Sequence, residues 1–140
     1  MGSIIAIDFG EKRTGLAHTD PNKIIATGLC TLETKEVVTF LKDHTRKNEV
    51  DTFVVGYPEQ KDGTPSAIEE SILQFISKLK NQLPDINIER YSERFTSKIA
   101  KQTIRQSALK KKHRNKKELL DEISATLILQ SYLTYKSRSL

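Results

Sequence analysis

The run Ser3-Ile4-Ile5-Ala6-Ile7-Asp8, near the start of the chain, decides how the rest is interpreted. It is almost entirely apolar and ends on a carboxylate, a pattern typical of a buried central strand. Residues 10–15 follow as a turn bracketed by glycines. Two more strands are expected at 16–19 and 24–32, joined across 20–23. Such short connections predict an antiparallel meander.

Helical spacing and further strands alternate after this meander. The expected elements are a helix, a strand, a helix, a strand and two helices, at 37–44, 52–57, 68–83, 86–90, 100–108 and 116–135. The order βββαβαβαα predicts one α/β domain over residues 1–140. We expect a mixed five-stranded sheet with helices on both faces and right-handed crossovers between its parallel strands.

The bulk composition indicates a soluble protein of the cytoplasm. The chain has 140 residues, enough to bury a core, and its one cysteine, Cys30, can form no intramolecular disulfide. A charge at Asp8 comes too early for a signal peptide, and no apolar stretch approaches the roughly 20 residues of a membrane helix. We therefore expect no membrane association.

The net charge of +5 is concentrated in one segment. Residues 98–117 carry nine lysines and arginines and no acidic residue, so the other 120 residues sum to −4. Its densest part comprises Lys110, Lys111, Lys112, Arg114, Lys116 and Lys117. One interpretation is a binding segment for a polyanion such as nucleic acid. The other is a solvated charged loop.

Three carboxylates are candidates for catalysis. Asp8 ends the first strand, at the edge where open α/β sheets place their ligands, although an aspartate there can also cap a turn. Glu93 directly follows the last expected strand, where it is either a partner of Asp8 or a surface residue near a helix start. Asp121 opens the helix face of Ala125, Ile128 and Tyr132, which suits packing on the sheet.

An ionised carboxylate that points inward is costly unless it is paired or bound to metal. Convergence of the three would create a site of hard oxygen ligands for Mg²⁺ or Mn²⁺, with Glu122 as a reserve ligand. Paired divalent ions can activate water for phosphodiester cleavage. Other chemistries fit less well: the chain lacks a phosphate-binding G-x-x-x-x-G-K-[ST] loop, and His18, His44 and His113 lack metal-ligand spacing.

Four blocks of the sequence resemble the YqgF (RuvX) family. They occur in order and span nearly the whole chain, as Ile7–Ala17, Val55–Pro58 with Asp62-Gly63-Thr64, Glu93–Ser97 and Asp121–Leu133. The resemblance implies a ribonuclease-H-like fold related to Holliday-junction resolvases. It also implies a nuclease that matures the 5′ end of pre-16S ribosomal RNA in ribosome biogenesis. The matched acidic positions are Asp8, Glu93 and Asp121.

Two positions depart from the family pattern. Ser92 stands where an acidic residue usually precedes the glutamate, and Tyr57 stands where leucine is more usual. The motif arginines Arg13 and Arg94 either contact the scissile phosphate or hold carboxylates in salt bridges. We expect Gly10 and Gly15 to serve the backbone turn, not the ligand.

The leading hypothesis is a metal-dependent nuclease acting on precursor RNA. A Holliday-junction resolvase of the same chemistry would make two symmetric cuts in branched DNA, which favours a two-fold dimer; the sequence leaves monomer and homodimer open. A non-catalytic module that binds RNA or the ribosome would keep the basic segment without needing the carboxylates. An actin-like or sugar-kinase-like phosphotransferase would need two such domains.

Overall fold

The computed structural model describes residues 2–58, 66–92 and 116–138. Five strands form one sheet in the order β3-β2-β1-β4-β5. They are β1 (Ser3–Asp8), β2 (Arg13–Thr19), β3 (Ala26–Glu33), β4 (Val50–Tyr57) and β5 (Asn87–Ser92). The first three pair antiparallel, whereas β4 and β5 run parallel to β1. The predicted mixed five-stranded sheet is confirmed.

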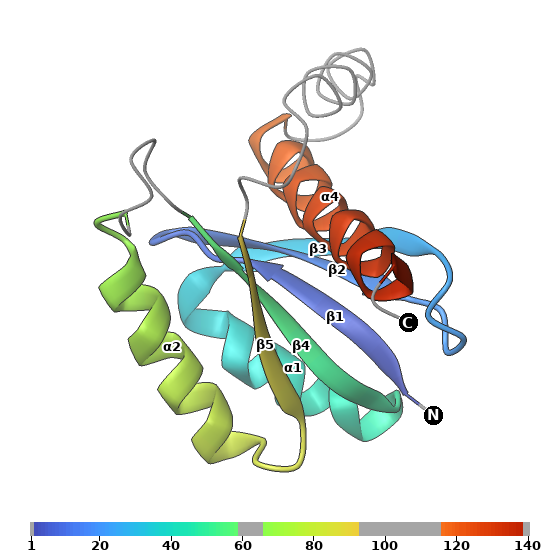
Figure 1. Cartoon of the computed structure of the whole chain (residues 1–140). Helices are drawn as coiled ribbons and strands as arrows, with labels where there is room; N and C mark the ends of the chain where they lie inside the picture. Colours follow the sequence, from blue (N-terminus) through green and yellow to red (C-terminus); the bar gives the residue numbers. More distant parts are fainter. Residues whose placement is uncertain (1, 59–65, 93–115, 139–140) are drawn as a thin grey trace.

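Helices cover both faces of this sheet (Figure 1). A short 3₁₀ helix, η1 (Thr34–Glu36), leads into α1 (Val37–Lys47), which lies beside α2 (Glu69–Gln82) on one face. The long α4 (Lys116–Arg138) crosses the other face and packs on β1, β2 and β3. The helix expected at 100–108 falls outside the described residues.

Each face has its own hydrophobic core. The α1–α2 side buries large aliphatic and aromatic side chains, among them Ile5, Ile7, Leu16, Leu41, Phe53, Ile72 and Leu79. The α4 side buries smaller ones together with two tyrosines: Ile4, Ala6, Ala17, Val54, Tyr91, Ala125, Ile128, Leu129 and Tyr132. Alternation along β1 sends Ile5 and Ile7 to one side and Ile4 and Ala6 to the other.

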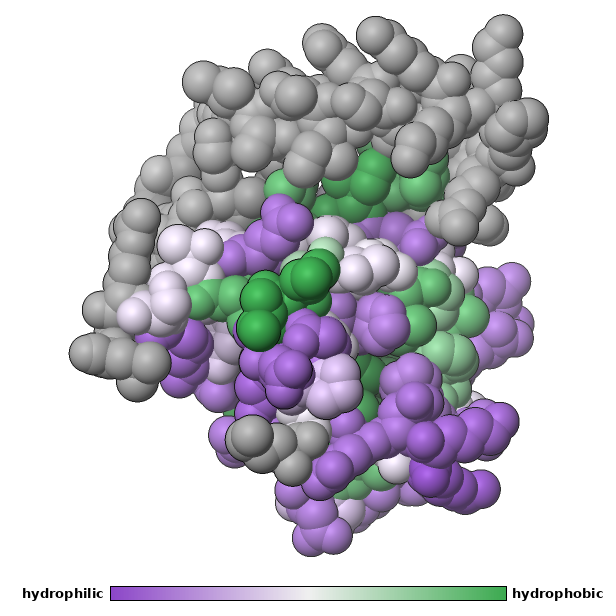
Figure 2. Space-filling view, turned by 90° about the vertical axis from the view of Figure 1, so that its right-hand side faces the viewer, coloured by the Kyte–Doolittle hydropathy of each residue, from purple (hydrophilic) through white to green (hydrophobic). Residues whose placement is uncertain are grey.

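Several strand boundaries differ from the prediction: β4 begins at Val50 and β5 ends at Ser92, and the starts of β2 and β3 differ as well. Ile24 and Ile25 precede β3 and are 70% and 63% exposed, because the Asp20 carboxylate accepts hydrogen bonds from their backbone N–H groups at 2.8 and 2.7 Å. The side of the molecule that carries this connection shows apolar side chains among hydrophilic ones (Figure 2). At the other end, β2 begins at Arg13, so the turn after β1 is shorter than the predicted 10–15.

Candidate active site

Three parallel strands end at the same edge of the sheet. Ile7 of β1 pairs with Val55 of β4, which in turn pairs with Arg90 of β5. Asp8 comes directly after Ile7 and is the last residue of β1. Because Ile4 and Ala6 contact the α4 side, alternation also directs Asp8 toward the α4 side of this edge.

Gly15 of β2 allows α4 to lie close to the sheet edge that carries Asp8. It is paired with Asp8 across the antiparallel ladder, where opposite Cα atoms are roughly 5 Å apart. A Cβ on Gly15 would lie only 2.1 Å from the backbone carbonyl oxygen of Asp121. The α4 backbone therefore rests directly on β2 at this glycine, and Asp8 and Asp121 flank one point of the sheet. The turn role expected for Gly15 is wrong: this residue lies inside β2 and permits a close approach.

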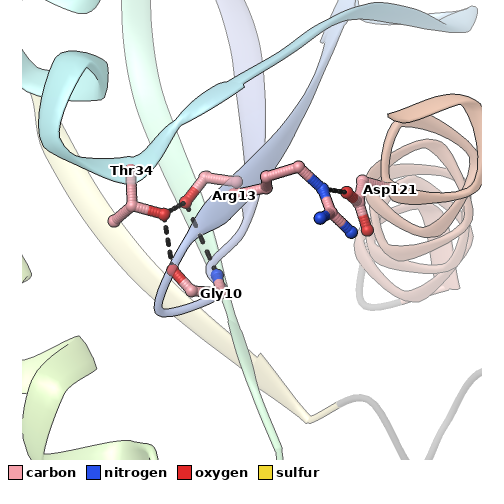
Figure 3. A network of polar contacts seen from close by, with 5 residues as sticks. Gly10, Arg13, Thr34 and Asp121 are labelled. Atoms are coloured by element: carbon pink, nitrogen blue, oxygen red, sulfur yellow. Dashed lines mark hydrogen bonds and ion pairs between the residues drawn. The ribbon is translucent and has the colours of Figure 1, made fainter. Parts of the chain in front are cut away.

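Asp121 stands on the predicted inward face of α4. Ala125, Ile128 and Tyr132 on that face are all buried. The Asp121 side chain is 29% exposed, and its Oδ2 accepts a hydrogen bond from Arg13 Nε at 3.0 Å (Figure 3). In this structure Arg13 thus makes the carboxylate pair, one of the two roles considered for it.

A threonine pair holds the turn between β1 and β2. Thr34 Oγ1 donates to the Gly10 carbonyl oxygen and lies 2.8 Å from Thr14 Oγ1, while the Thr34 N–H donates to the Lys12 carbonyl. A Cβ on Gly10 would lie 2.3 Å from the Arg13 carbonyl oxygen, so Gly10 serves this turn as expected. The network fixes the chain that follows Asp8 and positions Arg13 (Figure 3).

An arginine clamp, which sequence reasoning missed, ties the ends of β4 and β5 to α2. Arg90 donates to both Glu69 carboxylate oxygens, at 2.9 and 2.8 Å, and to the carbonyl oxygens of Val55 and Gly56. Its guanidinium also lies 5.1 Å from the ring centroid of Tyr57. This contact gives the unusual tyrosine a role: it packs against the clamp. The only signal in the sequence was an arginine in a short strand.

Most of the remaining candidate residues lie outside the part of the chain that the structure describes. Glu93, Arg94, Lys110, Lys111, Lys112 and Arg114 lie outside the described residues, whereas Lys116 and Lys117 are the first two residues of α4. The Glu122 carboxylate lies over Gly28 of β3, where a Cβ would be 3.1 Å from Oε1.

Within residues 2–58, 66–92 and 116–138, no group of three His, Cys, Asp or Glu side chains is arranged to hold a metal ion. The same ranges contain no helix with the length and apolarity to cross a bilayer.

Comparison with known sequences connects this chain to nucleases. The family model RuvX, described as Holliday junction resolvase, matches residues 2–135. A protein of Flavobacterium psychrophilum is 51% identical over 136 residues, covering 97% of this chain and 99% of its own length. One from Parabacteroides distasonis is 46% identical over the full length of both chains. Both carry the name "Putative pre-16S rRNA nuclease".

Solved structures share the fold at low sequence identity. The Thermus thermophilus RuvC in complex with a Holliday junction substrate has a TM-score of 0.58 and 13% identity, with 96% of each chain covered. The fowlpox virus Holliday junction resolvase has a TM-score of 0.53 and 16% identity, covering 95% of this chain and 99% of its own. These likenesses show that the fold is the RuvC-like ribonuclease H fold.

Proposed function

Because the chain belongs to the RuvX family, we propose that it is a divalent-metal-dependent nuclease that cleaves phosphodiester bonds of the 16S ribosomal RNA precursor. The observation that carries the proposal is the stack at Gly15. This residue pairs with Asp8 in the ladder and lies under the Asp121 backbone. This arrangement brings two aspartates, 113 positions apart in sequence, to one point of the sheet edge, and it supports the proposal that their carboxylates share a site.

The donor chemistry at this edge fits Mg²⁺ or Mn²⁺. Aspartate oxygens are the hard ligands that these ions prefer, and an inward carboxylate is stabilised by a bound cation. Asp8 and Asp121 would hold the ion, and when bound it would activate a water and neutralise charge at the phosphate. Asp121 also pairs with the Arg13 guanidinium at 3.0 Å.

Glu93 is the third ligand that we propose. Along β5, the Glu89 carboxylate accepts a hydrogen bond from Tyr132 of α4, and Tyr91 packs in the α4-side core. Arg90, between them, binds Glu69 of α2 on the other face. Residues 89 and 91 therefore face the side of Asp8, and Glu93, the next residue of this odd-numbered series, lies outside the described residues.

Arg13 is suited to hold both Asp121 and a substrate phosphate. Its Nε donates to Asp121, while its two Nη groups carry four further N–H donors. Arginine binds phosphate oxygens through such paired donors. We propose phosphate contacts also for Arg94 and for the basic residues Lys110, Lys111, Lys112, Arg114, Lys116 and Lys117. A ribosomal RNA substrate would place the protein in the cytoplasm.

A cleavage assay tests the function. Purified protein is incubated with Mg²⁺ or Mn²⁺ and labelled 5′-extended 16S precursor RNA, unrelated single-stranded RNA, duplex DNA or a four-way DNA junction. We expect cleavage of the precursor near its mature 5′ end and loss of cleavage with EDTA. Preferred, paired cleavage of the junction by a dimer would reassign the substrate to branched DNA.

Matched variants separate the site from the fold. Asp8→Asn should lower the cleavage rate at least ~100-fold, because it removes a proposed metal ligand. Each tenfold loss of rate corresponds to about 1.4 kcal/mol of lost transition-state stabilisation. The control is Asp43→Asn, which makes the same chemical change on α1, where Asp43 is exposed and pairs with Lys47 at 3.3 Å. Equal activity of the two variants would contradict the proposed site.

A further inference from the structure

A groove of about 780 Å³ runs between α1 and α2, on the face of the sheet opposite α4. Its base is apolar: Phe9, Val38 and Phe75 line it, and the rings of Phe9 and Phe75 lie 5.1 Å apart. Its walls carry Lys35, Lys42 and Lys78, one carboxylate, on Glu11, and neutral hydrogen-bonding side chains. The groove therefore combines an apolar base with a cationic rim.

The groove adjoins a second hollow that reaches Arg13. A neighbouring depression of about 530 Å³ is lined by Lys12 and Arg13 and shares Glu11 and Lys35 with the groove. Arg13 is the residue that pairs with Asp121. At the base, Phe9 directly follows Asp8 in the chain. The two hollows thus form a path from Arg13, the partner of Asp121, over the turn after β1 to the space between α1 and α2.

The charges along this path favour an anionic occupant. Five cationic side chains, on Lys12, Arg13, Lys35, Lys42 and Lys78, line the two hollows against two carboxylates, on Glu11 and Glu33. Lys42 of α1 is held in place because its Nζ donates to Gln82 Oε1 of α2 at 2.9 Å. This cation is therefore fixed between the two helices. The whole path lies outside the basic run of residues 98–117.

We propose that the α1–α2 groove binds a single-stranded segment of the nucleic-acid substrate adjacent to the bond that is cut. Unpaired bases expose apolar faces beside a charged backbone, which matches an apolar base with lysines along the rim, whereas a duplex hides its base faces. Ser71 and Gln82 both line the groove, and the eleven residue steps between these positions span about 16 Å along the helix, room for a short run of nucleotides. The proposal rests on the proposed nuclease function for the position of the cut, but binding is testable without cleavage.

The test compares two double variants with equal charge loss on the same two helices. Lys42→Gln with Lys78→Gln removes groove lysines, whereas Lys47→Gln with Lys80→Gln removes one lysine from each helix outside the groove. Binding of a fluorescent oligouridine RNA of about 12 nucleotides is titrated in EDTA over a range of salt. Because each phosphate contact contributes about 0.7 to the salt slope, loss of two should lower the slope by about 1.4 and weaken affinity about 25-fold near 0.1 M salt.

A second measurement requires no variants, only the wild-type protein with and without the oligouridine. Lys42 and Lys78 should be protected from acetylation when the oligouridine is bound, with Lys47 and Lys80 as internal references. The proposal is supported if the groove variant loses affinity and slope while the control variant binds like wild type. Equal affinities of the two double variants, or no binding of the RNA by wild type, would overturn it. Groove binding without precursor cleavage would instead contradict only the proposed function, and cleavage with unaffected binding in the groove variant would contradict only the groove.

Discussion

The two faces of the sheet differ in how they are packed. Toward α1 and α2, the buried residues are large, with Phe53, Leu41 and Ile72 fully enclosed. Toward α4, the buried side chains of Ala6 and Ala17 are small, and Gly15 lets the helix backbone touch the strand. The first face therefore holds the larger buried side chains, whose burial contributes to stability. On the α4 face, small side chains let the helix lie close to the sheet. This packing brings Asp121 of α4 near the carboxyl end of β1.

The largest stability effect should come from the α1–α2 side. Leu41→Ala should lower the free energy of unfolding by about 2–5 kcal/mol, because it leaves a cavity in a fully buried site. Urea denaturation measures this loss. Cleavage per folded molecule should stay close to wild type, since Leu41 lies on the face away from Asp8. A Leu41→Ala protein with unchanged stability would contradict the assignment of this face as the main core.

Two glycine-to-alanine variants should distinguish a contact with the α4 backbone from a contact with an α4 side chain. Gly15→Ala should cost about 1–3 kcal/mol and reduce cleavage strongly, because its Cβ would meet the Asp121 backbone carbonyl at 2.1 Å. Gly28→Ala is the matched control under the same helix. There the nearest atom is Glu122 Oε1 at 3.1 Å, the end of a side chain that can turn away.

Thermal unfolding and cleavage rates of the two glycine variants decide this point. We expect Gly28→Ala to change the free energy of unfolding by less than about 1 kcal/mol and to keep its activity. If Gly15→Ala is as stable and active as Gly28→Ala, close backbone contact does not position Asp121.

Replacing Arg13 should affect metal binding more than folding. The Arg13–Asp121 pair is 39% and 29% exposed, so Arg13→Gln should cost less than about 1 kcal/mol of stability. Removing a cation next to Asp121 should tighten Mn²⁺ binding, by about tenfold if the lost repulsion is near 1.4 kcal/mol. Calorimetric titration measures this affinity. Weaker Mn²⁺ binding in Arg13→Gln would mean that Arg13 helps to organise the ion site.

The last prediction concerns a single side chain, the thiol of Cys30 of β3. Burial, with a further contribution from the Glu122 charge, raises the pKa of its thiol from 9.0 to about 11. At pH 8 its alkylation by iodoacetamide should therefore be about 100-fold slower than that of an unhindered cysteine. The folded protein holds this proton more tightly than the unfolded chain, so this contribution to stability is complete below pH 9 and is lost as pH rises toward 11.

Glu122→Gln provides the control for the thiol. It removes the smaller cause of the pKa shift, so alkylation should become modestly faster while burial continues to slow it. Alkylation of the native protein at the rate of the urea-unfolded chain would contradict the packing of α4 over β3.

Sequence patterns predicted the sheet and its helices because burial repeats with the periods of strand and helix. The inward face of Asp121 was found in this way, since Ala125, Ile128 and Tyr132 recur on one side of α4. The boundaries at Arg13 and Ile24 were wrong. Pairing of Arg13 with Glu33 extends β2, and the Asp20 carboxylate draws Ile24 into a turn, so side-chain contacts and ladder contacts overrode local propensity.

The contacts that complete the site were less predictable. Arg13 and Asp121 are 108 residues apart, and nothing in either segment reveals that they pair. Gly15 looked like a turn residue because a glycine's tertiary neighbour is invisible in one sequence. The Arg90–Glu69 clamp was missed for the same reason: both residues are ordinary charged positions until the end of β5 meets the start of α2.

Mn²⁺ binding to three proteins tests most directly whether Asp8 and Asp121 form one ion site at the sheet edge. Titration of the wild type, Asp8→Asn and Asp43→Asn, followed by electron paramagnetic resonance, requires no nucleic acid and no activity. We predict saturable binding in the wild type and in Asp43→Asn, and at least about tenfold weaker binding in Asp8→Asn, the lower range for loss of a group that supports a metal. Mn²⁺ affinity in Asp8→Asn equal to that of Asp43→Asn would contradict the account.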